Sequence, residues 1–113
     1  MYYVYILRSR RDQLLYTGYT ANLKKRYWLH RNGHVKATRN RLPLDLVFCL
    51  PFYTRKETEH MEWFLKNTGS GRILKKKLAK IFNQEDFIKY LAWLKYYKPE
   101  LRRKYYTGPY GPP

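Results

Sequence analysis

The alternation of apolar and polar positions predicts three strands in the first half of the chain. Tyr2–Arg8 and Leu14–Tyr19 are rich in β-forming residues and too short to be helices. Residues 10–13 join them through a short polar connection, which predicts an antiparallel hairpin. The run Leu46–Leu50 is apolar throughout, as is typical of a central strand covered on both faces. Pro51 is expected to end that strand.

Four later segments have a helical period, and most carry capping signals. Thr20 or Asn22 can cap the first helix, and Thr54 forms a capping box with Glu57 before the second. Asn83 can cap the last helix. The predicted helices cover residues 23–31, 55–66, 72–82 and 85–98, with a basic loop at 33–45 and a flexible break at 67–71.

This succession predicts an α+β domain in which helices flank a small three-stranded antiparallel sheet. We expect residues 1–82 to form the domain and residues 83–99 to add an amphipathic C-terminal helix. That helix could extend the core, cover an exposed sheet or mediate dimerisation, although a monomer is favoured. Residues 100–113 are rich in Arg, Lys, Tyr, Pro and Gly, which predicts a flexible tail able to touch nucleic acid.

The charge of the chain indicates a polyanionic partner. Its 24 Lys and Arg residues stand against 8 Asp and Glu, which gives a net charge of +16. Such an excess opposes compaction by self-repulsion, so nucleic acid is the expected partner. An anionic membrane surface is the weaker alternative, because no basic amphipathic helix has a clean apolar face. The 13 tyrosines could stack on unpaired bases, which suits single strands.

Cysteine content and the N-terminal sequence bear on the compartment. Cys49 is the only cysteine, which excludes an intrachain disulfide and a cysteine-based zinc site. A buried thiol of this kind is typical of a reducing compartment. The N-terminal residues lack the features of a signal peptide, and no apolar run reaches membrane-spanning length. We therefore expect a cytoplasmic protein that does not enter membranes.

The hairpin and the first helix place polar side chains on common faces. If the turn centres on residues 10–11, Tyr5 and Tyr16 lie opposite each other and both hydroxyls emerge from one face. Gly18 shares that face, and its missing side chain would leave a hollow for a phosphate. Arg26 and His30 are four residues apart, so they share one face of the helix.

A carboxylate on the second predicted helix completes the candidate set. Glu62 flanks the inward stripe formed by Thr58, Met61 and Leu65. A carboxylate beside the core has two explanations. It could pair with a cation, such as Lys66 four residues on, or it could bind a metal ion.

Basic residues around these positions are expected to contact phosphates. The loop at 33–45 is predicted to form a flap over the binding face, and the lysines of 72–82 to form a cationic rail. The expected nucleic-acid contacts are Gly18, Lys25, Lys36, Thr38, Arg39, Arg41, Lys66, Arg72, Lys75 and Lys76.

The order and spacing of these residues resemble the GIY-YIG nuclease family, in particular its small standalone members and the N-terminal nuclease domain of the excision-repair endonuclease. The resemblance covers roughly residues 1–78 and includes the run Glu62…Lys66…Gly71-Arg72. The two family tripeptides correspond here to Tyr3-Val4-Tyr5 and Tyr16-Thr17-Gly18. The resemblance implies a GIY-YIG nuclease-like fold and a role such as DNA repair. It also implies a catalytic set of Tyr5, Tyr16, Arg26, His30 and Glu62.

The same resemblance implies a separate role for each of these residues in phosphodiester hydrolysis. Glu62 would bind one divalent ion, Mg²⁺ or Mn²⁺, because these hard cations prefer oxygen ligands. Arg26 would bind the non-bridging phosphate oxygens in fork geometry. Tyr5 would be the general base, with His30 bonded to it or to the water, and Tyr16 would position water and phosphate. His30 is the alternative base, since its unperturbed pKa is about 6.5.

More than one function remains open at this point. The most concrete is a metal-dependent endonuclease that acts on DNA, in single-stranded or branched form, with RNA as a further possible substrate. The alternative is a non-catalytic basic module that binds DNA or RNA. A nuclease-like scaffold that acts through a partner is a third. Loss of cleavage with intact binding in Glu62→Ala would favour the enzyme.

Overall fold

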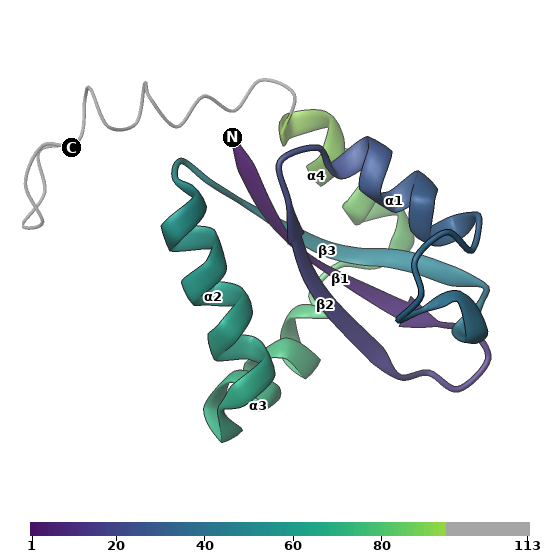
Figure 1. Ribbon diagram of the computed structural model, residues 1–113. Coiled ribbons are helices and arrows are strands. Elements are labelled where there is room, and N and C mark those ends of the chain that lie inside the picture. The colour runs from purple at the N-terminus through teal and green to yellow at the C-terminus, as the bar shows by residue number, and fades with distance from the viewer. Residues whose placement is uncertain (95–113) are drawn as a thin grey trace, which may run out of the picture.

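The computed structural model describes residues 1–94, so the end of the last predicted helix and the predicted tail lie outside the described residues. The expected α+β fold, with a three-stranded antiparallel sheet and flanking helices, is confirmed (Figure 1). Within this range, every helix is too short or too polar to span a bilayer. The elements are β1 (Tyr2–Ser9), β2 (Leu15–Thr20), α1 (Leu23–Arg31), the 3₁₀ turn η1 (Arg39–Arg41), β3 (Leu44–Phe52), α2 (Arg55–Asn67), α3 (Gly69–Leu78) and α4 (Gln84–Leu94).

The central strand of the sheet is β1, because the strand order is β2-β1-β3. Val4–Leu7 are at most 2% exposed. The expectation that the apolar run in β3 marks a central strand is therefore wrong. Its apolar character reflects contact with both core clusters, one through Leu44 and Cys49 and the other through Phe48. Pro51 also does not end β3, and it is tolerated there because an edge strand forms a ladder on one side only.

The hairpin register differs from the expected one. Tyr5 pairs with Gly18, and Tyr16 pairs with Leu7. The turn lies further along the chain than predicted, because Gln13 adopts a left-handed φ of 63° and the Ser9 N–H donates to the Leu14 carbonyl. The shift amounts to two residues, so Tyr5 and Tyr16 remain on one face of the sheet.

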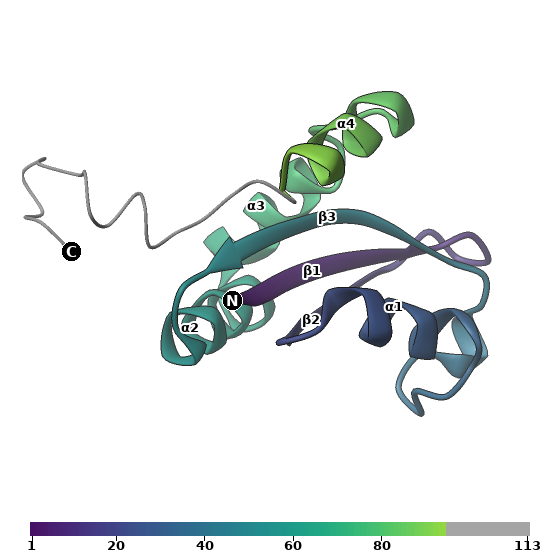
Figure 2. The ribbon, with the colours of Figure 1, turned by 90° about the horizontal axis from the view of Figure 1, so that it is seen from above.

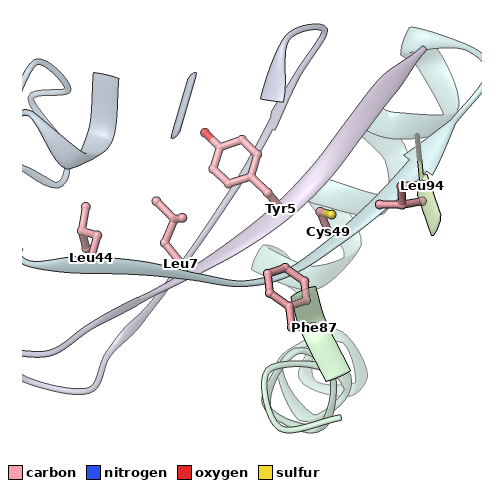
Figure 3. Close-up of a cluster of buried hydrophobic side chains, with 6 residues drawn as sticks. All are labelled: Tyr5, Leu7, Leu44, Cys49, Phe87 and Leu94. Carbon is pink, nitrogen blue, oxygen red and sulfur yellow. The ribbon is translucent and has the colours of Figure 1, made fainter. Parts of the chain in front are cut away.

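Helices cover both faces of the sheet (Figures 1 and 2). On one face Tyr5 and Leu7 form a cluster with Phe87 and Leu94 of α4, and Tyr27 of α1 packs against it. Figure 3 shows this cluster, with the Tyr5 hydroxyl directed away from Cys49 and Phe87. On the other face Ile6 and Phe48 pack with Ala79, which caps α3.

Local capping signals decide where the helices begin. Asn22, Thr54 and Asn83 accept backbone N–H groups at their respective helix starts, as the sequence predicts. The helix does break within the predicted segment 67–71, but the break is the single residue Thr68, which ends α2 and whose hydroxyl accepts the Gly71 N–H at the start of α3. A Cβ at Gly71 would overlap the Phe64 carbonyl, so glycine allows the two helices to meet at this corner.

Candidate active site

The Tyr5 phenol is the centre of the candidate site. Its residue is 2% exposed, and its ring crosses β2 above Gly18. A Cβ at Gly18 would lie 2.6 Å from Tyr5 Cζ, well inside van der Waals contact. The hollow expected at Gly18 is therefore filled by the Tyr5 ring. Gly18 is buried, and its structural role is to make room for that ring and not to contact a phosphate.

The Tyr5 hydroxyl is held by two groups from α1. Arg26 Nε donates to it over 3.3 Å, and His30 Nε2 lies 2.9 Å away. Tyr16 completes the group, with ring centroids 6.5 Å from Tyr5 and 5.2 Å from His30. The Arg26 guanidinium is also close enough to Tyr16 for the two side chains to interact electrostatically, which contributes to the raised pKa of Arg26. Four of the five predicted catalytic residues thus converge from β1, β2 and α1.

His30 is fully buried and has a partner on each ring nitrogen. Its second nitrogen, Nδ1, lies 2.7 Å from Thr38 Oγ1. Thr38 is itself 0% exposed, so its predicted contact with nucleic acid is wrong. Its hydroxyl fixes the imidazole instead, because the loop between α1 and η1 folds back over the helix. Because α1 ends at Arg31, no regular element spans His30 and Thr38, and sequence periodicity therefore cannot signal this pair.

Burial keeps the tyrosine and the histidine uncharged at neutral pH. Desolvation, followed by the positive charge of Arg26, lowers the pKa of His30 to about 4. Burial also raises the pKa of Tyr5, with a smaller opposing effect from the Arg26 hydrogen bond. All partners are satisfied when Tyr5 donates its proton to Nε2 and Nδ1–H donates to Thr38. The free protein therefore holds a neutral tyrosine–histidine pair beside a cationic arginine.

Glu62 approaches the same phenol from α2. Thr58 and Leu65, on the same helix, are buried and fix the orientation of its face. The negative charge of Glu62 is close enough to contribute to the raised pKa of Tyr5. Its side chain is 21% exposed, and its ion pair with Lys66 is loose at 3.7 Å between Nζ and Oε1. The carboxylate is therefore accessible and only weakly neutralised.

The carboxylates around Glu62 decide whether a divalent ion fits the site. Residues 1–94 contain no group of three or more His, Cys, Asp or Glu side chains that could surround a metal. The neighbouring Glu59 accepts from Tyr19 and Arg55, both at 2.9 Å, so its carboxylate is already engaged. Glu62 would be a lone protein ligand. Mg²⁺ is often bound by one or two carboxylates with water and substrate phosphate completing its shell, so the site fits such an ion.

The predicted phosphate-contacting cations fall into two groups. Lys25, Lys36 and Arg39 are exposed on α1 and the following loop. The second group lies on α2 and α3, where the charges of Lys66, Arg72 and Lys76 all act on Lys75. Arg41 belongs to the same 3₁₀ turn as Arg39, and it lines a cavity together with Lys75 and Lys76.

Comparison with known proteins identifies the family. Residues 1–77 match the model of the GIY-YIG catalytic domain. A UPF0213 protein of Clostridium perfringens is 38% identical over 79% of this chain and 96% of its own length. A UPF0213 protein of Oceanobacillus iheyensis is 41% identical over 74% and 95%. The solution structure of a UPF0213 protein from Bacillus halodurans is 34% identical, covers 74% of this chain and 88% of its own, and has a TM-score of 0.46. The chain belongs to the GIY-YIG family and is similar to its small UPF0213 proteins.

Proposed function

We propose that the chain is a metal-dependent endonuclease that hydrolyses phosphodiester bonds in DNA. One observation carries the proposal: the Tyr5 hydroxyl is held between a neutral His30 and the guanidinium of Arg26, with the Glu62 carboxylate nearby. Family membership supports the chemistry, because the matched domain is described as catalytic. The net charge of +16 supports a polyanionic substrate.

The neutral pair addresses the main difficulty of a tyrosine base. Burial raises the pKa of Tyr5, so a preformed tyrosinate is scarce at neutral pH. We infer a relay in which the attacking water gives a proton to Tyr5 Oη while Tyr5 gives its own proton to His30 Nε2. The water oxygen forms a bond to phosphorus, the bond from phosphorus to the leaving oxygen breaks, and solvent protonates the leaving alkoxide. Tyr5 and His30 thus act together as the base.

Arg26, and a cation bound by Glu62, would stabilise the negative charge on the phosphoryl oxygens. Arg26 donates to Tyr5 through Nε, which leaves its terminal nitrogens for phosphoryl oxygens. A divalent cation on Glu62 would stabilise negative charge on the phosphoryl group. Tyr16 lies beside His30 and Tyr5, in position to orient the water or the phosphate.

A panel of single-stranded, duplex, flap and junction DNA, with RNA counterparts, tests the proposal in Mg²⁺ and Mn²⁺. We expect cleavage of at least one DNA form by the wild type and its loss in Tyr5→Phe. Tyr19→Phe is the matched control. It also removes one phenolic hydroxyl, but that hydroxyl donates to Glu59, outside the site. Absence of metal-dependent cleavage across the panel would refute the nuclease assignment.

The pH dependence of kcat/KM separates the relay from a preformed tyrosinate. The relay requires neutral Tyr5 and neutral His30, so the profile should be level from about pH 5 to about pH 9, between the two free-enzyme pKa values. A tyrosinate base would instead give a rise of about tenfold per pH unit across that range, because its fraction grows with pH. The second outcome would eliminate the relay without eliminating hydrolysis.

A non-catalytic nucleic-acid-binding module is the second candidate. The observation in its favour is that the free protein lacks a ready base: the pKa of about 4 makes His30 a weak proton acceptor, and the raised pKa of Tyr5 leaves little tyrosinate at neutral pH. The module would bind nucleic acid with a steep salt dependence, and removal of divalent ions would not alter any product. The cleavage panel with and without EDTA distinguishes the two.

A further inference from the structure

A cationic hollow lies where the β1–β2 hairpin, η1 and α3 meet. Its volume is about 720 Å³, within the range of small-ligand sites. None of the described residues that line it is acidic or aromatic. Five basic side chains do so: Arg8, Arg41, Lys75, Lys76 and Lys80.

The fold places these cations from three separate elements. Arg8 Nη2 donates to the carbonyl of Ala79, 3.0 Å away, so its guanidinium is fixed at the C-terminal end of α3. The carbonyl of Arg41 accepts the Ser9 hydroxyl at 2.7 Å, which ties η1 to the end of β1. The hollow is therefore a built cavity and not a group of lysines on one exposed helix face.

The carboxylates near the hollow offset its charge only in part, Asp45 through Arg8 and Asp12 through Arg41. The four ion pairs found within residues 1–94 use the carboxylates of Asp45, Glu59, Glu62 and Glu85. The cation in each pair lies outside the hollow. Asp12 lies near Arg41, but its carboxylate accepts the Leu14 N–H and does not line the cavity. Burial, and then the neighbouring cations, lower the pKa of Lys75. An anion bound here would relieve that repulsion.

The hollow is separate from the candidate active site. Arg8 lies three residues from Tyr5 on β1, so its side chain is on the opposite face of the sheet. The cations Lys66 and Arg72 lie between Glu62 and Lys75 and connect the two regions. A strand that passes Glu62 could follow these cations to the hollow.

We propose that this hollow binds the backbone phosphates of a nucleic-acid strand, away from the Tyr5–His30 site. Within residues 1–94 the lining is basic and lacks aromatic side chains, which favours phosphate over base contacts, so binding should be independent of sequence. The proposal requires only that the chain bind nucleic acid. It does not depend on hydrolysis.

The test compares two double variants that remove the same charge. Lys76→Gln/Lys80→Gln changes exposed lysines of the hollow, and Lys56→Gln/Lys89→Gln changes exposed lysines outside it. Binding of a fluorescein-labelled single-stranded oligonucleotide is measured in EDTA over a range of salt concentrations. Each lost phosphate contact lowers the slope of log Kd against log salt by about 0.7 for single strands, so the hollow variant should lose about 1.4. The control should lose much less.

Two outcomes would overturn the proposal. Equal changes of slope in both variants would mean that the hollow contributes only net charge. A 5′-phosphorylated oligonucleotide that binds the wild type far better than its hydroxyl counterpart, with the difference absent in the hollow variant, would assign the site to a terminal phosphate instead. Because EDTA prevents cleavage, neither result depends on the nuclease assignment. Thermal unfolding of both variants checks that they fold.

Discussion

Burial of His30 predicts that the protein loses stability in mildly acidic solution. The pKa of His30 is about 4 in the folded protein, against about 6.5 in an unfolded chain. Below pH 6.5 the His30 imidazole is protonated in the unfolded chain, whereas in the folded protein it stays neutral until the pH nears 4. The stability contributed by the neutral imidazole is therefore complete above about pH 6.5, and it is lost as the pH falls from there to about 4.

The size of the effect follows from the difference between the two pKa values. At pH 4.5, protonation of this histidine in the unfolded chain lowers the free energy of unfolding by about 2.5 kcal/mol. His30 is 0% exposed and is bonded to Tyr5 and Thr38, so solvent screening does not reduce the figure in the way it does for surface groups. For a domain of this size, such a loss is a large fraction of the total stability.

Urea denaturation at pH 7 and pH 4.5 measures the effect, with His30→Gln and His34→Gln as the comparison. His30→Gln removes the titration, so its stability should fall by about 2.5 kcal/mol less than that of the wild type over this interval. His34 is exposed and stacks on Trp28, so His34→Gln should follow the wild type. Carboxylate titrations are common to all three proteins and cancel. Equal losses in wild type and His30→Gln would refute the reasoning, as would an NMR titration that places the His30 imidazole near pH 6.5.

Three further substitutions test how the site is held and used. Gly18→Ala should displace the Tyr5 ring, destabilise the protein by about 1–3 kcal/mol and reduce cleavage, as measured by urea denaturation and a nuclease assay. Thr38→Val should leave buried His30 Nδ1 without a partner and cost about 1–3 kcal/mol in the same denaturation, whereas Thr38→Ser should restore stability. Glu62→Gln should lower kcat by roughly 100-fold or more while leaving DNA binding in EDTA intact, and an unchanged kcat would exclude Glu62 as the metal ligand.

The sequence predicted the features that depend on neighbouring residues. The capping residues Asn22, Thr54 and Asn83 were identified because a cap is formed between residues two or three positions apart. The common face of Arg26 and His30 follows from helix geometry in the same way, and both side chains reach Tyr5.

Features that depend on distant contacts were missed. The order of the strands is set by packing of whole elements, so an apolar run could not distinguish the edge strand β3 from the central β1. The hairpin register depends on the left-handed Gln13, and glutamine gives no signal for that conformation. Thr38 looked like one polar residue of a basic loop, and only the folded loop brings its hydroxyl to His30.

The electrostatics of the site couple its proton chemistry to its substrate. In the free protein, Arg26 contributes to the low pKa of His30, and Glu62 contributes to the high pKa of Tyr5. A bound phosphodiester would bring negative charge to Arg26 and offset the first effect, and a cation on Glu62 would offset the second. Both changes make transfer of a proton from Tyr5 to His30 less costly. The proposed base would thus be weak in the free protein and become effective only once substrate and metal are both in place.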